Sequence, residues 1–562
     1  MALTGAADPG NAQGFEEPGA QSPRAPRVPR ARLGWAVLVA VAGGLALAAA
    51  FPPAGIWPLA VAGPALLVVA LWHSSLRASF LIGLAFGIAF FVPLLSWLVN
   101  VAWYAWIALA MTEALILGLL AVGQQVLLRL RAWPLGVAGW WVAAEALRGR
   151  WPYAFPWGRL AMSQAGAPTA GWAAVGGAPL LTFLIALAGA ALAWLLIGPG
   201  RGEPARGDPA RGERAGDSGQ PGGSRVPGLA RRRALPLLAA AGTVGLAVAG
   251  AVLPVDQPAA APQATIAAVQ GDVPRARTLA NQLRATKVTA NHAAATEALA
   301  AQVRAGARPA PDLVIWPENS TDLDPLLNPP VYATIAQAVS AIGKPVLVGS
   351  VLQNPLRNAG QLWLPRSGPA GVYAKRQLVP FGEYIPFRSL LDKFTSLPSL
   401  QPVNFTPGHK AVVFRVGKIR LGDVICYEVG FDNLVSSEVR AGANLLAVQS
   451  NDADFELDGQ TGESAQQLAM ARIRAVESDR AVVYVSTTGE SAIIAPDGTV
   501  MTRSGIWRRA VLEARVPLRS QLTLADRAGS WPETAITALT LAALAWAAAR
   551  ALTQRRRARP PR

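Results

Sequence analysis

The sequence predicts an α/β sandwich domain inserted into a polytopic bundle of about eight transmembrane helices. Three observations lead to this fold class. Hydrophobic residues make up 52% of the chain and charged residues only 15%, whereas about a quarter of an ordinary soluble protein is charged. Apolar runs close to the ~20 residues that a bilayer requires recur along the first half of the chain. Residues 255–530 instead alternate short strand-like runs with helical stretches.

The N-terminal segment 1–32 is rich in Pro, Gly, Ala and Arg, and such a composition cannot bury a core. We expect it to be a disordered cytoplasmic tail. Residues 33–197 then carry six apolar runs, and each run is interpreted as a transmembrane helix. They lie at roughly 34–51, 55–72, 79–99, 104–128, 133–147 and 170–197.

An Arg-, Gly- and Pro-rich linker at 198–233 separates the sixth run from a seventh, which is predicted at 234–254. The eighth predicted helix occupies 531–550, and a basic tail follows it at 551–562. Eight spans place both termini on one side of the membrane. With both termini in the cytoplasm, the arginine-rich linker and tails lie inside, as the positive-inside rule requires. The 255–530 domain then faces outward.

The charge pattern bears on the partners of the protein. The net charge of +17 could indicate nucleic-acid binding, but many of the arginines crowd into the linker and the tails beside apolar runs. Asp and Glu are mixed among the linker arginines, so we expect membrane lipid and no nucleic acid as a partner. Arg148, Arg150 and Arg159 fall on the outer side, where a headgroup or docking role and simple interfacial anchoring are both open. Glu113, inside the fourth run, is either functional or paired within the bundle.

The 255–530 domain is predicted to be a layered sandwich. Its strand-like runs lie at 264–269, 313–316, 346–351, 412–416, 421–426, 445–449, 482–486 and 491–494. Helical stretches are expected at 275–304 and 460–479. Gly417-Lys418 between two of the runs indicates a hairpin. Antiparallel hairpins that alternate with helices favour a sandwich over a simple doubly wound sheet.

Cys426 is the only cysteine, which excludes an intramolecular disulfide and a multi-cysteine zinc site. With only three histidines, a His-rich metal centre is not expected either, and we expect no cofactor. The thiol ends a predicted strand before a tight turn, where α/β folds present side chains to ligands. A thiol is a strong nucleophile once a base removes its proton. A buried structural cysteine is the competing interpretation.

Two charged residues in similar positions support the nucleophile. Glu318 follows a predicted strand in the sequence Trp-Pro-Glu, and Lys375 lies in a motif at 373–383 that also contains Glu383. Glu318 could act as the general base toward the thiol, and Lys375 could stabilise the oxyanion of a tetrahedral intermediate. Either residue alone would be interpreted as a solvated surface charge. Their joint occurrence with Cys426 favours a nucleophilic site.

The order Trp-Pro-Glu, Tyr-x-Lys-x-x-Leu-Val-Pro-Phe-Gly-Glu and Cys-Tyr-Glu resembles the nitrilase (carbon-nitrogen hydrolase) superfamily with its Glu-Lys-Cys triad. The longer second motif and the membrane spans resemble one branch, the apolipoprotein N-acyltransferases of bacteria. The likeness extends to Glu-Ala-Leu-Arg-Gly at 145–149, Phe-Pro-Trp at 155–157, Ser-Asn-Asp at 450–452 and the helical motif at 470–477. The chain departs from many relatives at Asp454 and lacks an aromatic residue after Pro274.

The resemblance implies a triad of base Glu318, oxyanion-stabilising Lys375 and nucleophile Cys426. It implies that Glu383 and Glu428 are accessory glutamates that order the lysine and the thiol, and that Tyr427 shapes the acyl pocket. The implied fold is an αββα sandwich, carried by eight transmembrane helices on the outer face of the bacterial plasma membrane.

The implied reaction is the last acylation of lipoprotein maturation. Cys426 would take an acyl group from a phospholipid donor as a thioester, in ping-pong fashion, and pass it to a diacylated apolipoprotein acceptor. We expect the enzyme to be a monomer.

Two other functions stay open at this point. A membrane-tethered nitrilase-type amidase would use the same three residues, but a single anchor helix would suffice to tether it. A non-catalytic scaffold or transporter would give Glu318, Lys375 and Cys426 no reason to converge.

Overall fold

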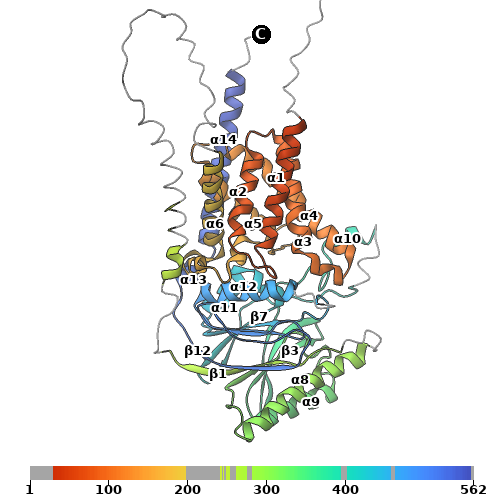
Figure 1. Ribbon diagram of the computed structural model, residues 1–562. Helices are drawn as coiled ribbons and strands as arrows, with labels where there is room; N and C mark the ends of the chain where they lie inside the picture. The colour runs from red at the N-terminus through yellow and green to blue at the C-terminus, as the bar shows by residue number, and fades with distance from the viewer. Residues whose placement is uncertain are drawn as a thin grey trace, which may run out of the picture.

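The computed structural model describes residues 30–197, 241–242, 245, 248–253, 261–274, 281–393, 401–456 and 462–557. It consists of a helical bundle and an α/β domain attached to one end of it (Figure 1). The predicted linker at 198–233, nearly all of the tail at 1–32, and most of the predicted seventh helix lie outside the described residues. Figure 1 shows the first turn of α1 and the last turn of α14 at the end of the bundle that points away from the domain.

Seven helices form the described part of the bundle. They are α1 (Arg30–Ala49), α2 (Leu59–Leu71), α3 (Leu76–Leu94), α4 (Trp103–Leu127), α5 (Trp133–Arg148), α6 (Ala173–Ile197) and α14 (Trp531–Arg557). The 3₁₀ turns η1 (Ser96–Asn100), η2 (Leu160–Gln164) and η3 (Pro168–Trp172) lie between some of them, and η4 (Gly250–Val252) comes after α6 in the chain.

The predicted count of eight spans is not confirmed. Five helical segments of the described chain are long and apolar enough to cross a membrane. They are Arg32–Ala49, Leu76–Leu94, Trp103–Leu127, Pro168–Ile197 and Trp531–Gln554. Helix α2 has 13 residues and α5 has 16, which correspond to about 20 and 24 Å at 1.5 Å per residue. Both helices are therefore shorter than the ~30 Å hydrocarbon core of a bilayer.

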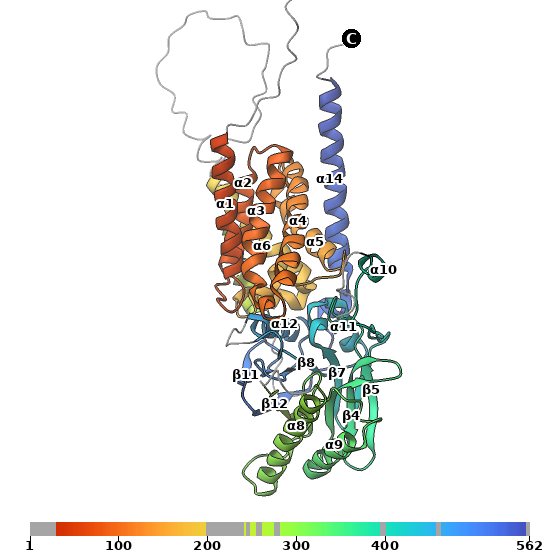
Figure 2. The same ribbon diagram turned by 90° about the vertical axis from the view of Figure 1, so that its right-hand side faces the viewer.

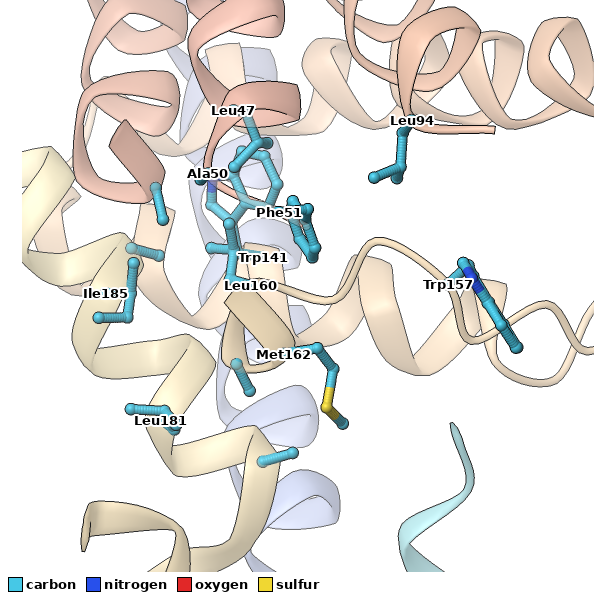
Figure 3. Packing of buried hydrophobic residues seen from close by; sticks show 14 of the residues in the cluster. Leu47, Ala50, Phe51, Leu94, Trp141, Trp157, Leu160, Met162, Leu181 and Ile185 are labelled. Atoms are coloured by element: carbon cyan, nitrogen blue, oxygen red, sulfur yellow. The ribbon is translucent and has the colours of Figure 1, made fainter. Parts of the chain in front are cut away.

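Small residues let neighbouring helices of the bundle approach closely. A Cβ atom on Gly87 of α3 would lie only 2.6 Å from the Cα of Ala114 on α4, so any larger residue would push the two helices apart. The bundle core includes Leu181 and Ile185 on α6 and Trp157 on the loop after α5 (Figure 3). Apolar packing therefore reaches from the helices into the loop that faces the domain.

The domain contains two mixed six-stranded sheets. The first has the order β12-β1-β2-β3-β4-β5, with bounds Ala510–Pro517, Gln263–Gln270, Leu313–Ile315, Val346–Leu352, Arg357–Leu364 and Gly368–Ala374. The second has the order β11-β10-β9-β8-β7-β6, with bounds Val500–Arg503, Ala492–Ile494, Val482–Ser486, Leu445–Ser450, Ile419–Ile425 and Val413–Val416. Strands β1 to β3 run parallel, as do β7 to β9, and the outer strands are antiparallel.

Helices cover the outer face of each sheet, which gives the four-layer sandwich that the sequence predicts. Helices α8 (Asn281–Arg304) and α9 (Pro329–Ile342) pack on the first sheet, and α11 (Asp432–Arg440) and α12 (Gly462–Ser478) on the second. A core of apolar side chains lies between the sheets and includes Ile266 and Leu421. The short helices α10 (Arg388–Leu391) and α13 (Leu524–Ala528) complete the described domain.

Helices α11 and α12 also join the domain to the bundle. Figure 2 shows both helices between the transmembrane helices and the sheets, with α8 and α9 on the far side. One continuous apolar core includes Phe91 of the bundle, Leu468 and Met470 of α12, and Val448 of β8. The domain is therefore packed against the bundle and not merely tethered to it.

Candidate active site

The three predicted site residues all follow strands. Glu318 comes three residues after β2, Lys375 directly after β5, and Cys426 directly after β7. Cys426 also opens the 3₁₀ turn η6 (Cys426–Gly430). Two of these strands belong to the first sheet and one to the second. The fold therefore brings residues from both sheets to one site.

Lys375 lies between two carboxylates. Its Nζ is 2.9 Å from Oε1 of Glu318 and 3.1 Å from Oε1 of Glu383. The Nδ2 atom of Asn358 on β4 donates to the same two oxygens, at 2.7 Å each. Lys375 is only 1% exposed. The two glutamates and the asparagine therefore fix the position of the ammonium group.

The charges of this cluster shift one another's pKa. Burial raises the pKa of Glu318, and the neighbouring Lys375 opposes that shift. Burial alone would lower the pKa of Lys375, but Glu318 and Glu383 outweigh it and raise the pKa above its usual value. Lys375 is therefore an ammonium ion at neutral pH, as the stabiliser of an oxyanion must be.

Cys426 adopts a backbone conformation that is unusual for a residue other than glycine. Its φ is +51°, in the left-handed region that non-glycine residues seldom occupy and that often marks functional turns. The residue is 7% exposed. Burial raises the pKa of the thiol well above its usual value, the charge of Glu318 raises it further, and Lys375 lowers it. The resting group is therefore a thiol, and its activation requires a base.

Glu428 ties the turn of Cys426 to the chain that carries Lys375. Its carboxylate accepts hydrogen bonds from the backbone N–H groups of Ile425, Arg376 and Gln377, at 2.8, 2.7 and 3.0 Å. The hydroxyl of Tyr373 donates to it at 2.8 Å. Glu428 thus holds the backbone on both sides of the site, although no described hydrogen bond joins it to the thiol itself.

Tyr427, next to Cys426, contacts the bundle. Its hydroxyl donates to the carbonyl oxygen of Ala154 at 2.6 Å. Its ring stacks on Trp157 with the centroids 5.6 Å apart, and Trp157 in turn stacks on Phe155. The Phe-Pro-Trp motif singled out in the sequence therefore forms an aromatic wall beside the turn of Cys426.

Buried ion pairs hold this contact in place. Arg148 pairs with Glu113 of α4 and donates to the carbonyl oxygen of Trp157 at 2.6 Å. Arg159 binds both carboxylate oxygens of Asp432 on α11, at 2.7 and 2.9 Å. Glu113 and Arg148 are thus paired within the bundle, and Arg159 joins the bundle to the domain; Arg148 and Arg159 are 3% and 6% exposed.

Arg474 of α12 connects Asp432 to the turn that begins at Cys426. A second guanidinium, that of Arg474, lies 2.6 Å from Asp432, and its Nε donates to the carbonyl oxygen of Val429 at 2.8 Å. Burial would raise the pKa of Asp432, but Arg159 and Arg474 hold it well below its usual value. Asp432 is therefore a carboxylate that joins bundle, α11 and α12.

Sequence reasoning missed two polar residues of this site. Asn358 contacts both glutamates, as described above, and Gln467 of α12 donates from Nε2 to the sulfur of Cys426 at 3.3 Å. Asn358 lies on a strand that was not predicted, and Gln467 lies within a helix with no motif to mark it. Among the described residues, no three His, Cys, Asp or Glu side chains are grouped so that they could hold a metal ion.

Comparison with known proteins identifies relatives that cover most of the chain. The family model "Apolipoprotein N-acyltransferase N-terminal domain" matches residues 43–191, and the model "Carbon-nitrogen hydrolase" matches residues 265–521. Among solved structures, an amidase from Nesterenkonia sp. is 18% identical, with a TM-score of 0.35, over 48% of this chain and 95% of that protein.

Curated relatives match at higher identity. An apolipoprotein N-acyltransferase from Mycolicibacterium smegmatis is 38% identical over 87% of this chain and 81% of the relative. Apolipoprotein N-acyltransferases from Azotobacter vinelandii and Pseudomonas putida are 29% and 30% identical, over 93% and 91% of this chain and 97% and 96% of the relatives. Because the likeness runs through both the bundle and the domain that holds the site, this chain belongs to the apolipoprotein N-acyltransferase family.

Proposed function

We propose that this protein acylates the N-terminal amine of diacylated apolipoproteins, with a phospholipid as the acyl donor and Cys426 as the nucleophile. Two lines of support meet here. The relatives that are named for this activity align with this chain over 81% and 97% of their own length. The observation that carries the catalytic part is the buried Lys375, hydrogen-bonded to Glu318 and within electrostatic reach of the strained Cys426.

The first half-reaction forms an acyl thioester. Glu318 takes the thiol proton of Cys426, and the thiolate attacks the ester carbonyl of the phospholipid. The Lys375 ammonium stabilises the oxyanion of the tetrahedral intermediate. When the intermediate collapses, the C–O bond of the ester breaks. The lysophospholipid alkoxide leaves with the proton that Glu318 holds.

The second half-reaction transfers the acyl group to the amine. The free α-amine of the N-terminal diacylglyceryl-cysteine attacks the thioester carbonyl and gives up a proton to Glu318. The C–S bond then breaks, and the sulfur of Cys426 recovers a proton from Glu318. A thioester reacts with an amine more readily than an oxygen ester does, which is the reason for two steps. The rings of Trp157 and Tyr427, beside the turn of Cys426, would help to keep water away from the thioester.

We also propose the roles of the accessory residues and the orientation of the chain. Glu383 orders Lys375, Glu428 orders the turn of Cys426, and Tyr427 forms a wall of the acyl site. The domain lies on the outer face of the bacterial plasma membrane, both termini lie in the cytoplasm, and the enzyme acts as a monomer. Eight spans satisfy this orientation if α2, α5 and the segment 234–254 cross together with the five longer helices.

The test is mass spectrometry of the purified protein after incubation with phospholipid vesicles. We expect an acyl adduct on Cys426 that is absent from Cys426→Ala and that a diacylated lipopeptide removes with formation of a triacylated product. An adduct that only water removes would indicate the amidase function instead. If the wild-type protein forms no adduct but still acylates the lipopeptide, Cys426 is not the nucleophile.

A further inference from the structure

A buried glutamine touches the sulfur of the proposed nucleophile. Gln467 lies on α12, is 1% exposed, and places Nε2 3.3 Å from the Sγ atom of Cys426. Helix α12 is a different element from those that carry Glu318 and Lys375. The sulfur therefore has a polar neighbour that the triad does not include.

The amide of Gln467 has two further polar neighbours. Its Oε1 lies 3.0 Å from the hydroxyl oxygen of Ser450. Its Nε2 also donates to Oε1 of Glu463, one turn earlier on α12. The N–H groups of the amide thus face Cys426 and Glu463.

Glu463 and Asp452 form an acidic pair behind this amide. Asp452 accepts hydrogen bonds from the hydroxyls of Ser450 and Ser486, at 2.6 and 2.7 Å. Burial raises the pKa of both carboxyl groups, and the charge of Asp452 raises that of Glu463 well above its usual value. Two adjacent buried carboxyl groups hold a shared proton, because both cannot ionise. Glu463 therefore accepts the second N–H of Gln467 in its neutral form.

We propose that Gln467 is a further catalytic residue, whose side-chain N–H donates to the Cys426 sulfur and stabilises the thiolate. This inference rests on the proposed function, because it assigns Gln467 to the same nucleophile. When Glu318 takes the thiol proton, the contact becomes a hydrogen bond to a charged acceptor and strengthens. A donor that is stronger toward the thiolate than toward the thiol lowers the barrier to its formation.

Several titratable groups act on the sulfur, and the test must separate Gln467 from them. They are Glu318 after β2, Lys375 after β5, Asp452 after β8, Glu463 on α12 and Tyr484 on β9. Of these groups, only Lys375 is a cation. Gln467 therefore adds an uncharged donor to a site that is otherwise crowded with acids.

The experiment measures the rate at which iodoacetamide alkylates the full-length protein in detergent, as a function of pH. Cys426 is the only cysteine, so the mass of the intact protein reports this site alone. The variant Gln467→Met keeps the length of the side chain and removes the donor. We expect its alkylation midpoint to lie about one to two pH units higher and its acylation by phospholipid to be about 10- to 100-fold slower, as for a lost hydrogen bond to a charged group.

The neighbouring Gln466 is a matched control. It lies on the same helix, is 4% exposed, and donates to the carbonyl oxygens of Pro52 and Leu94 in the bundle instead of to the sulfur. We expect Gln466→Met to keep the wild-type midpoint. Gln467→His, which restores an N–H donor, should recover part of the shift.

The outcomes separate the two proposals. A wild-type midpoint in Gln467→Met would overturn the role of Gln467 and leave the nucleophile intact. A wild-type protein in which Cys426 takes up neither iodoacetamide nor an acyl group would overturn the proposed function itself. Should Gln467→Met fail to fold, Gln467→Leu also removes the donor and adds no charge, so an unshifted midpoint there is equally contradictory.

Discussion

At the scale of single residues, two carboxylates fix the ammonium group of Lys375. Its ammonium group separates Glu318 from Glu383, and both carboxylates also accept from Asn358. Removal of the ammonium leaves two adjacent carboxylates, one of which must then take up a proton. The lysine therefore favours the ionised form of Glu318, which the proposed mechanism requires of its base.

We predict that Lys375→Met lowers the rate of Cys426 acylation by about 10²- to 10³-fold, the usual effect of removing one oxyanion donor. The loss of a buried partner should also reduce the free energy of unfolding by about 3–5 kcal/mol. The measurements are the rate of adduct formation by mass spectrometry and denaturant unfolding in detergent. Lys418→Met, in the exposed turn of the β6–β7 hairpin, is the control and should change neither quantity. An active Lys375→Met protein would rule out the oxyanion role.

At the scale of elements, α8 holds the first sheet through a buried histidine. His292 is fully buried, and its Nδ1 bonds to the carbonyl oxygen of Val288 at 2.8 Å. Its ring lies 5.7 Å from that of Trp316, two residues before Glu318. Burial lowers the pKa of His292 to about 4, the bond to Val288 opposes the shift, and the charge of Arg509 adds to it. The ring is therefore neutral in the folded protein.

We predict that this histidine makes the domain less stable in acid. An unfolded histidine has a pKa of about 6.5. Below that pH the unfolded chain binds a proton that the folded chain does not, so stability falls as the pH drops from about 6.5 toward 4. At pH 5 the loss is about 2 kcal/mol. In His292→Leu this contribution should vanish, so that the variant loses about 2 kcal/mol less than the wild type between pH 7.5 and pH 5.

Denaturant unfolding in detergent at the two pH values measures this difference. His409 is exposed, so His409→Leu should follow the wild-type pH dependence. Equal losses of stability in the wild type and in His292→Leu would show that the pKa of His292 does not differ between the folded and unfolded states.

At the scale of the whole molecule, the bundle and the domain form one packed body. The core that starts among the transmembrane helices continues through α12 to the second sheet. Charged pairs such as Arg159 with Asp432 close the same interface. The turn of Cys426 lies at this junction, since Tyr427 contacts the loop after α5. The bundle therefore positions the site in addition to anchoring it.

The proposed orientation makes a prediction for intact cells. In a Cys426→Ala background, Ser367→Cys places a thiol in the exposed turn between β4 and β5, and Ser218→Cys places one in the arginine-rich linker. A membrane-impermeant maleimide should label the first in wall-stripped cells and the second only after lysis, because the domain faces outward and the linker inward. Labelling of the linker in unlysed cells would contradict the proposed orientation.

The sequence alone determined those features that depend on local pattern. The apolar runs predicted the helices of the bundle, and the β-branched runs predicted β1, β2, β3 and β6 to β10. Strands β4 and β5 were missed because glycine and polar residues interrupt them, which weakens the strand signal. Helix α9 was missed although Pro stands in its first turn. Glu318 and Cys426 were selected because each follows a predicted strand, and Lys375 because it lies in the motif at 373–383.

Only the tertiary structure decided which distant residues meet. Strand β12 pairs with β1 across most of the domain sequence. Asn358 binds Glu318, and Gln467 reaches Cys426, although no periodicity or spacing links these pairs. The same holds for Arg148 and Arg159, whose exceptional position in the topology was evident in the sequence but whose acidic partners were not. Burial and periodicity are properties of a local segment, whereas a hydrogen bond between two buried side chains depends on how whole elements pack together.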